Sequence, residues 1–386
     1  MDAFREPRLS RSRRQAATIT RAIRAGRARA KAAPPQVPDV DGGALRDLVA
    51  EAAADAQLVD VPVNRPPWTT TGVQVTAGEQ VTWLAWGFGH AVKPLGIGAW
   101  PRNLLHGRVD GGTAQASARD TLTFTADRSG PIELASVFPG ELREDGSIAT
   151  DRFPYRAMRG SLAVVVARWP QGTDPREALV AVAGRDPSGL CAAEAARLGD
   201  PPKPPPGWHH HPLLSPDEVY TPSEAGVTAN VRETVGIVRR PAEAPLTPTL
   251  RLRWSWRLDT LPSQLPEDTP LTHDYLSVAL EFNDGQDLTW HWSCSLPEGL
   301  AYPCPLDHWR HRETHIVARS GTADLGRWVD EERPVLADHQ VAIGGPAPAR
   351  VVRAWLISVS FFQRGEGRGE FGRIDLVDGD DTIRVL

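Results

Sequence analysis

Apolar and polar residues alternate along most of the chain. Between Val61 and Trp169, short runs carry an apolar residue at every second position and are separated by clusters of Gly, Pro, Asp and Asn. This period is typical of strands that bury one face, and a series of such short strands indicates a β-sandwich or barrel. The alternation returns over residues 207–386. We therefore expect an all-β protein with two antiparallel β-sandwich, jelly-roll-like domains.

The clearest strand lies at 250–258. Its apolar positions include Trp254 and Trp256, and the polar positions that alternate with them include Arg253 and Arg257. Such a strand turns one face to the core and a strongly polar face away from it.

Two further alternating runs, at 275–282 and 288–293, are joined by Asn283-Asp284-Gly285. An odd loop is needed to match their apolar faces, and a three-residue loop with Gly285 in the left-handed region provides one. The predicted register pairs Leu280 with Leu288, Val278 with Trp290, and Ser277 with His291.

Helix signals are confined to short stretches. Residues 43–57 are rich in helix formers, and Asp174-Pro175 gives an N-cap before a helix to about Ala183, followed by a second from Ser188 to Leu198. The proline-rich run from Gly199 to Gly207 predicts an extended linker. We therefore expect a basic arm and short helix at 1–57, a first sandwich at 58–170, a helical and Pro-rich linker at 171–206, and a second sandwich at 207–386.

Charge and cysteine content add expectations about the surroundings. The first 31 residues carry nine Arg and one Lys against two acidic residues, although the net charge of the chain is −5. We expect a flexible or partly helical solubilising arm with only weak contact to nucleic acid or another anionic surface. Arg13-Arg14 resembles a twin-arginine signal, but further arginines interrupt the apolar run that export requires. Three Cys without metal-type spacing favour the cytoplasm. No apolar stretch reaches the ~20 residues of a membrane span.

The polar faces of these strands offer the main candidate binding site. If the strand at 250–258 pairs near the hairpin, Arg253, Arg257, Tyr275, Glu281 and His291 share one face. Guanidinium groups bind carboxylates in a two-pronged manner, so this face suits a polar or anionic polymer. The alternative is an ordinary solvated sheet face.

Other chemistry-bearing residues give weaker signals. Trp309 and Trp328 lie in irregular sequence, where an exposed indole can stack on a sugar ring. The run 209–211, three consecutive His, is expected to be solvated linker rather than a chelator, and Cys294 and Cys304 are expected to be two half-buried thiols rather than a disulfide. The sequence contains no phosphate loop, serine-hydrolase elbow, zinc helix motif or dinucleotide fingerprint. We therefore predict no catalytic residue, cofactor or metal site.

Residues 61–169 resemble the small bacterial galactophilic lectins. The matching segments are Val63-Asn64, Trp68-Thr-Thr-Thr-Gly72-Val73, Gly78-Glu-Gln-Val81, Ala85-Trp-Gly87, Leu105-His-Gly-Arg-Val109 and Ser129-Gly130-Pro-Ile-Glu-Leu134. The resemblance implies a β-sandwich that binds galactose through calcium held by Asp and Asn near the C-terminal strand. Here Ser136-Val137-Phe138 and Tyr155-Arg156-Ala157-Met158-Arg159 stand at the corresponding places, so we expect the fold without the calcium site.

Residues 207–386 resemble a bacterial family of sandwich domains of unknown function. The matching segments are Leu252-Arg-Trp-Ser-Trp-Arg-Leu-Asp259, Thr272-His-Asp-Tyr275, Ile316-Val-Ala-Arg-Ser-Gly321, Gly326-Arg-Trp-Val-Asp-Glu-Glu-Arg333 and Phe371-Gly-Arg-Ile-Asp375. This resemblance implies a fold and no reaction.

Three functions remain open on the sequence. The leading hypothesis is non-catalytic recognition of a carbohydrate or cell-envelope polymer by the second domain. One alternative is a polysaccharide-cleaving enzyme, a lyase or hydrolase, in which Tyr275 or His291 acts as base and an arginine neutralises a uronate. The other is a structural or assembly protein whose sandwiches contact other chains.

Overall fold

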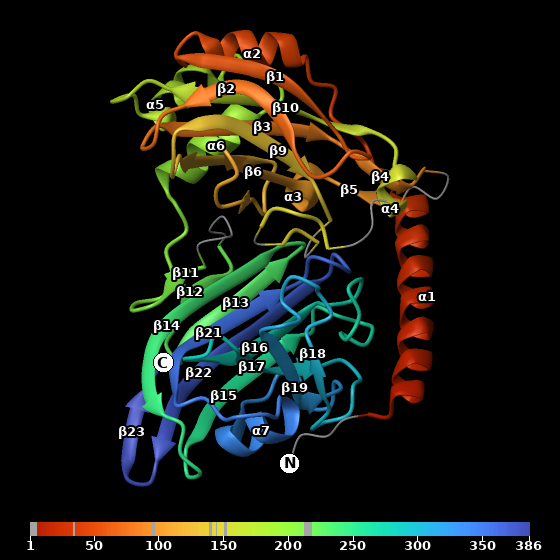
Figure 1. Cartoon of the computed structure of the whole chain (residues 1–386), viewed down its shortest axis with the longest axis vertical. Coiled ribbons are helices and arrows are strands. Elements are labelled where there is room, and N and C mark those ends of the chain that lie inside the picture. Colours follow the sequence, from red (N-terminus) through yellow and green to blue (C-terminus); the bar gives the residue numbers. More distant parts are fainter. Residues whose placement is uncertain are drawn as a thin grey trace. The chain divides into compact units, whose positions relative to one another are not determined.

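The computed structural model describes residues 6–33, 35–93, 97–138, 141–143, 145–149, 153–211 and 218–386. It confirms the all-β fold, and the chain divides into two compact units (Figure 1). The N-terminal unit contains residues from Gly26 to Pro202. The C-terminal unit contains the residues up to Ala25, Lys203–His211 and the chain from residue 218 on.

The N-terminal unit contains two four-stranded antiparallel sheets. One has the order β1-β10-β3-β8, from β1 (Asp55–Pro62), β3 (Gln80–Gly87), β8 (Thr121–Thr125) and β10 (Ser161–Trp169). The other has the order β2-β9-β6-β7, from β2 (Thr69–Val75), β6 (Leu105–Val109), β7 (Gln115–Ala116) and β9 (Gly130–Ser136). A separate hairpin joins β4 (Gly89–Val92) to β5 (Ile97–Ala99), and the short helices are α3 (Pro101–Leu104) and α4 (Phe153–Arg156).

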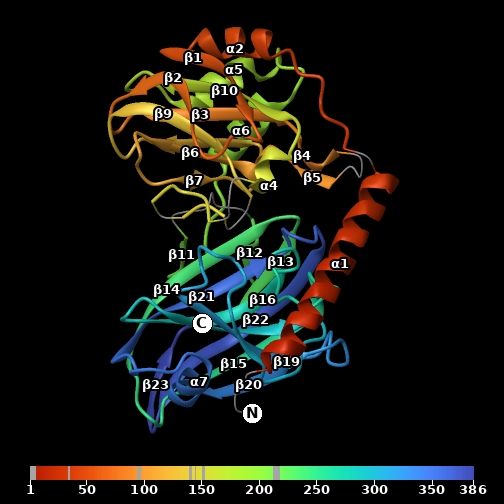
Figure 2. The ribbon, with the colours of Figure 1, turned by 45° about the vertical axis from the view of Figure 1, so that its right-hand side comes forward.

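Helices add a third layer to this unit. Figure 2 shows α2 (Gly42–Ala50), α5 (Pro175–Ala183) and α6 (Leu190–Gly199) beside its strands. Leu45 of α2, Leu179 of α5 and Cys191 of α6 form one buried cluster with Val165 of β10. The predicted cap of α5 is present, since the Asp174 carboxylate accepts the Arg176 backbone N–H at 2.8 Å. The helix predicted at 43–57 ends earlier, at Ala50, because the chain enters β1 at Asp55.

The basic arm is more ordered than the sequence suggested. It forms a 25-residue helix, α1 (Arg8–Ala32), in which Thr18 is fully buried. Arg14 Nη1 lies 2.7 Å from Asp268 Oδ2, and Gln15 Nε2 donates to the same oxygen at 3.0 Å. A buried carboxylate such as that of Asp268 requires a cation or hydrogen-bond donors. The prediction of a merely solubilising arm is therefore wrong for residues 14–18. No helix in the described part of the chain has the length and apolarity of a bilayer span.

The C-terminal unit is a sandwich of a seven-stranded and a six-stranded sheet. The seven-stranded sheet has the order β11-β14-β21-β16-β17-β19-β18, from β11 (His209–His210), β14 (Val235–Pro245), β16 (Tyr275–Phe282), β17 (Asp287–Ser293), β18 (Ala301–Pro303), β19 (Glu313–Ser320) and β21 (Arg350–Val359). The six-stranded sheet has the order β12-β13-β22-β15-β20, with β23 on β22, from β12 (Tyr220–Pro222), β13 (Val227–Arg232), β15 (Arg251–Thr260), β20 (Val329–Pro334), β22 (Glu366–Asp378) and β23 (Asp381–Arg384). The pairing of β17 with β19 is parallel, and the other pairings in these two sheets are antiparallel.

Tryptophans from both sheets meet in the core of this sandwich. The ring centroids of Trp254 and Trp290 are 6.4 Å apart, and those of Trp256 and Trp292 are 5.5 Å apart. The indole of Trp290 donates its N–H to Asp338 of α7 (Val335–Ala342) at 2.8 Å. Large rings from both sheets therefore fill the space between them, and the N–H groups of Trp290 and Trp292 have hydrogen-bond partners.

The predicted hairpin is confirmed in register and loop. Leu280 pairs with Leu288, Val278 with Trp290, and Ser277 with His291. The backbone N–H of Phe282 donates to the carbonyl of Gln286 at 2.8 Å, which closes a three-residue loop, and Gly285 has φ +84° as the loop requires.

Replacement of Trp256 by Ala is expected to lower the free energy of unfolding by about 3–5 kcal/mol, because the side chain is fully buried against three other aromatic rings. Denaturant unfolding of the full chain measures the change. The matched control is Trp328→Ala, whose side chain is 43% exposed and should cost less than about 1 kcal/mol. Equal losses in the two variants would contradict this account of the core.

Candidate functional site

The outer face of the seven-stranded sheet carries most of the polar groups of the C-terminal unit. The pairing of β16 with its neighbours sets Glu281 opposite both Asp287 and Arg353. The adjacent row on the same face contains, in order across the strands, Arg239, Trp355, Ala279, Thr289 and His315. The alternate positions of these strands face the apolar core instead.

The five predicted site residues do not share this face. Tyr275, Glu281 and His291 lie on β16 and β17, whereas Arg253 and Arg257 lie on β15 in the other sheet. The prediction that all five lie together is therefore wrong. Packing in the core separates them. The indoles of β15 point toward those of β17, so the polar faces of the two strands must point in opposite directions.

Arg253 and Arg257 are already paired where they stand. Arg253 Nε donates to Glu332 Oε2 at 2.7 Å, and Arg257 Nη2 lies 3.2 Å from Glu370 Oε2. The exposed ring of Trp328 lies 5.6 Å from the Arg257 guanidinium. A ligand role for these three residues stays a prediction from the sequence, and the patch described below, on the other sheet, does not include them.

Tyr275 and His291 are deeply buried. The Tyr275 hydroxyl donates to Glu313 Oε1 at 3.3 Å, and His291 Nε2 lies 3.0 Å from the hydroxyl of Tyr302. Burial, reinforced by the charge of Glu313, raises the pKa of Tyr275 well above its ordinary value. Burial, reinforced by His315, lowers the pKa of His291 well below its ordinary value. Both side chains are therefore neutral near pH 7.

Glu281 is held by two neighbours on β21. Its Oε1 lies 2.6 Å from Arg353 Nη1, and its Oε2 accepts the indole N–H of Trp355 at 3.1 Å. Both carboxylate oxygens of Glu281 therefore have a partner on β21, and the side chain is not a free anion.

A set of residues of which the sequence analysis had named only Trp309 as a candidate lies beside Glu281. This basic–aromatic patch comprises His211, Arg239, Trp309, Arg312 and Trp355. The His211 ring lies 5.2 Å from Trp355 and 5.7 Å from Trp309, and guanidinium groups lie 5.0 Å from the Trp309 ring and 5.9 Å from the Trp355 ring. Cation–π contacts of this length link each arginine to an indole.

The two arginines of the patch have no anionic partner. Among the described residues, neither Arg239 nor Arg312 has a carboxylate oxygen within 4.0 Å, and Arg312 Nε is buried without a hydrogen-bond partner. Burial and the neighbouring charges of Arg353 and Arg312 lower the pKa of Arg239. Asp287 lies beyond ion-pair distance of both, and burial and the charge of Glu313 raise its pKa although the charge of Arg312 opposes this.

His211 is not solvated linker, as the sequence suggested. It is 5% exposed, and its backbone N–H donates to Ile237 of β14 at 3.0 Å, while His209 and His210 pair with β14 as strand β11. Burial, with Arg239 and Arg312 nearby, lowers the pKa of His211 to about 4. The chain therefore joins the sheet as soon as the proline-rich segment ends.

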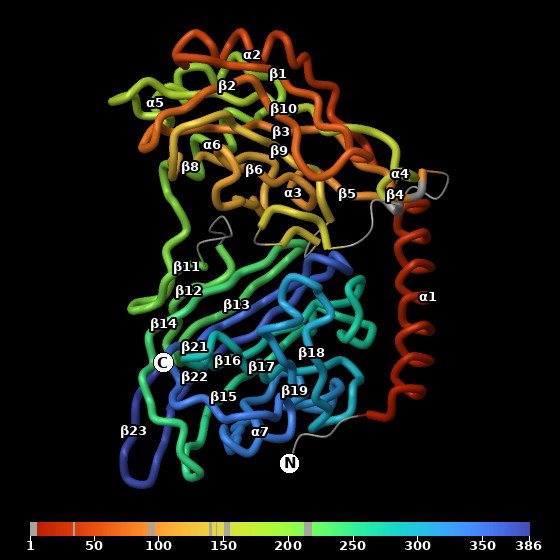
Figure 3. Tube along the Cα trace, in the orientation of Figure 1, coloured from red at the N-terminus to blue at the C-terminus, as the bar shows by residue number. Residues whose placement is uncertain are grey.

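A second group on the same face combines residues of β19 with residues of the loops at 261–274 and 304–312. Figure 3 shows β18 and β19, the strands beside it, in the Cα trace. This four-residue cluster comprises His273, Cys304, Glu313 and His315, all buried. Burial raises the pKa of Cys304 and lowers that of His273 to about 3. Burial alone would raise the pKa of Glu313, but contacts with His315 and His273 outweigh it and lower the pKa. Cys294 is half-buried and outside this cluster, and both thiols are free.

Sequence reasoning missed the patch and the cluster because loops supply several of their members. The one local signal was the run His308-Trp309-Arg310-His311-Arg312, which is dense in basic and aromatic residues. Of the predicted aromatic platforms, Trp309 belongs to the patch and Trp328 lies on the other sheet.

In the N-terminal unit, two of the positions at which the lectin resemblance led us to expect no calcium ligand hold buried apolar side chains. Val137 and Met158 are 0% and 1% exposed and pack into the core between its sheets. Such positions supply no side-chain oxygen to a cation that needs about six to eight.

Comparison with known proteins adds family and fold information. Residues 206–375, less than half of the chain, match a family model described as "Protein of unknown function (DUF3047)". No curated protein matches the chain significantly.

Several solved structures are similar. The EclA N-terminal domain, a PllA-like lectin, is 20% identical, covers 31% of this chain and 98% of its own, and has a TM-score of 0.24. The xyloglucanase domain of NopAA, a type three effector from Sinorhizobium fredii, in complex with cellobiose is 8% identical, with coverages of 46% and 94% and a TM-score of 0.28. The CBM22-1–CBM22-2 tandem domain of Paenibacillus barcinonensis Xyn10C is also 8% identical, with coverages of 85% and 98% and a TM-score of 0.22. TM-scores this low say nothing about the function of this chain, so the function is inferred from the geometry of the site.

The stability of the C-terminal unit should depend on pH through His211. Its folded pKa of about 4 lies below the ordinary 6.5, so the neutral imidazole contributes stability above pH 6.5 that is lost as the pH falls toward 4. Replacement by Gln, which does not titrate, should reduce the loss between pH 7 and pH 5 by about 2 kcal/mol. Denaturant unfolding of the full chain at both pH values measures this difference, and Trp256→Ala identifies the transition of the C-terminal unit. Identical pH dependence in wild type and His211→Gln would contradict the buried neutral imidazole.

Proposed function

We propose that the C-terminal sandwich recognises a carboxylate-bearing polysaccharide through the basic–aromatic patch, without cleaving it. The observation that carries the proposal is the pair of guanidinium groups, Arg239 and Arg312, that lie against indole rings and form no ion pair with any carboxylate in the described part of the chain. Surface arginines of this unit, such as Arg253 and Arg257, are instead paired with acidic side chains.

The chemistry of the patch suits an acidic sugar. A guanidinium binds a carboxylate with two parallel hydrogen bonds, each charge-assisted bond being worth roughly 1.5–3 kcal/mol when it is partly shielded from water. Trp309 is partly exposed and offers an apolar ring face of the kind on which a sugar ring stacks. Cation–π contact with Trp309 limits the motion of Arg312 and lowers the entropy lost on binding.

The local charge also favours an anion. Glu281 is engaged by Arg353 and by the Trp355 indole, and burial raises the pKa of Asp287. Arg239 and Arg312 therefore act as net positive charge on a chain whose overall charge is −5. Positive potential of this kind concentrates a polyanion at the surface and speeds association.

Burial favours recognition over cleavage. Tyr275 is 3% exposed and His291 is 0% exposed, so neither of the two residues considered as a base meets a polymer at the surface. The raised pKa of Tyr275 keeps its proton in place near pH 7. A general base must reach the proton that it abstracts, directly or through one water.

Replacement of Arg239 or Arg312 by Ala should weaken binding of polygalacturonate about tenfold each, the loss expected for one charge-assisted contact. Calorimetry on the full chain measures the affinity, with neutral dextran as the uncharged comparison. The matched control is Arg253→Ala, which removes one arginine from the opposite sheet and should leave the affinity unchanged.

Three outcomes would reject the proposal. They are no affinity of the wild type for any acidic polysaccharide, equal binding of dextran, and equal weakening by Arg253→Ala. Shortening of the polymer by the wild type but not by His291→Ala would favour the enzyme instead.

A further inference from the structure

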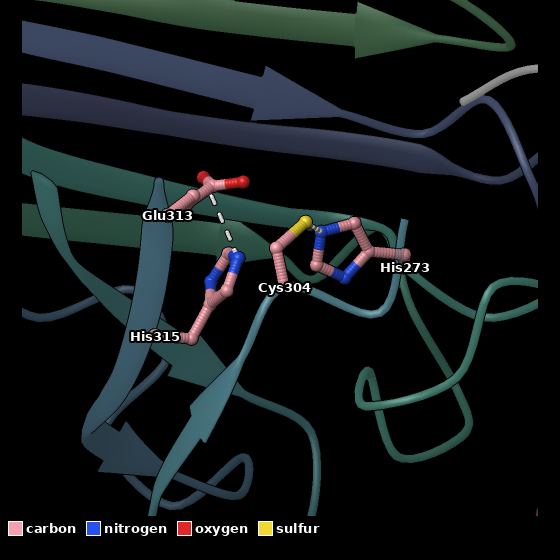
Figure 4. Close-up of side chains that lie close together, drawn as sticks. All are labelled: His273, Cys304, Glu313 and His315. Carbon is pink, nitrogen blue, oxygen red and sulfur yellow. Dashed lines mark hydrogen bonds and ion pairs between the residues drawn. The ribbon is translucent and has the colours of Figure 1, made fainter. Parts of the chain in front are cut away.

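The four-residue cluster brings together side chains that ligate metal ions. His273 lies in the loop at 261–274, Cys304 follows β18, and Glu313 and His315 lie on β19. One nitrogen, sulfur or oxygen atom from each lies within 4.8 Å of those from the others. Figure 4 shows the side chains converging on one another from these separate segments. None is more than 5% exposed.

His315 is the clearest sign that the cluster has an occupant. Its ring is 0% exposed, and neither Nδ1 nor Nε2 has a hydrogen-bond partner among the described residues. Its Nε2 lies 3.4 Å from Glu313 Oε1, and Tyr302 stacks on the ring with a centroid distance of 5.2 Å. Buried polar atoms in folded proteins are nearly always satisfied, so a ring held this firmly, with Nδ1 unpartnered and Nε2 facing only the Glu313 carboxylate among the described residues, points to a ligand.

His273 is oriented as metal-binding imidazoles usually are. Its Nδ1 lies 2.9 Å from the carbonyl oxygen of Glu267, which can only accept, so Nδ1 carries the proton. The lone pair is then on Nε2, which lies 3.4 Å from Cys304 Sγ. A carbonyl that fixes the tautomer of a histidine in this way is the common outer support of zinc ligands.

Two hydroxyl groups hold the Glu313 carboxylate in place. Tyr275 and Thr289 each donate to Oε1 at 3.3 Å. Their fixed positions keep the carboxylate directed toward His315 rather than toward solvent.

We propose that His273, Cys304, Glu313 and His315 bind a zinc ion. Two imidazoles, a thiolate and a carboxylate are zinc ligands, whereas calcium and magnesium take oxygen ligands only. Tetrahedral zinc places neighbouring ligand atoms about 3.3–3.8 Å apart, and two pairs of the cluster already stand at 3.4 Å. Four protein ligands and full burial describe a closed, structural site, which ties two loops to β19. This zinc site does not depend on glycan binding.

The test starts with the metal content of the purified full chain. After chelation and dialysis, one equivalent of zinc should bind per chain and raise the Tm by several degrees, because the ion binds the folded state only. Cobalt should bind in its place and give a thiolate-to-metal charge-transfer band in the near ultraviolet. Cys304→Ser should abolish that band, and Cys294→Ser, whose thiol lies outside the cluster, should retain it.

Two further measurements keep the test decisive if Cys304→Ser does not fold. His315→Gln keeps the thiol and should lower the zinc affinity at least tenfold. In the wild type, chelation should increase the alkylation of Cys304, located by mass spectrometry, while that of Cys294 stays constant. Zinc retained by both Cys304→Ser and His315→Gln, or no zinc-dependent change in Tm and Cys304 alkylation, would overturn the proposal. Zinc lost on replacing His209 and His210 together would assign the metal to β11 and overturn it equally.

Discussion

The meeting of two layers of tryptophan inside the C-terminal sandwich is the contact on which the rest of that unit depends. Trp254 and Trp256 of β15 pack against Trp290 and Trp292 of β17 across the space between the sheets. Each large ring buried this way contributes several kcal/mol, so the two strands cannot turn the same face outward. The polar side chains that alternate with the indoles are thereby divided between opposite surfaces of the unit.

The outer face of the seven-stranded sheet then has to bury charge, because loops cover part of it. Most of its ionisable groups satisfy one another: Glu281 is held by Arg353, and Glu313 by Tyr275 and Thr289. Within the described residues, Arg239 and Arg312 form no ion pair, and His291 and His315 each have a buried nitrogen without a hydrogen-bond partner. Arg239 and Arg312 lie in the basic–aromatic patch, and His315 lies in the four-residue cluster. Buried or half-buried groups that the fold leaves unsatisfied are costly, and proteins concentrate that cost where they bind something.

The N-terminal unit shows how one strand can serve two cores. Val164 and Val166 of β10 face the second sheet, while Val165 faces the helices α2, α5 and α6. The continuous apolar run of that strand is typical of a strand covered on both sides. Helices predicted only as linker elements therefore complete this unit.

The sequence by itself determined the elements and their local geometry. Alternation predicted the strands, Asp174-Pro175 the start of α5, and the odd loop with Gly285 the register of the hairpin, because each depends on residues close in the chain. Only the tertiary structure decided which strands share a sheet. Arg253 and His291 lie on opposite surfaces, although both alternate with buried tryptophans. Likewise His273, Cys304 and Glu313 meet only because two loops fold over β19. Such contacts are set by packing between segments that are distant in the sequence. Alternation of apolar and polar residues shows which face of a strand is buried, but it does not show which other segment covers that face.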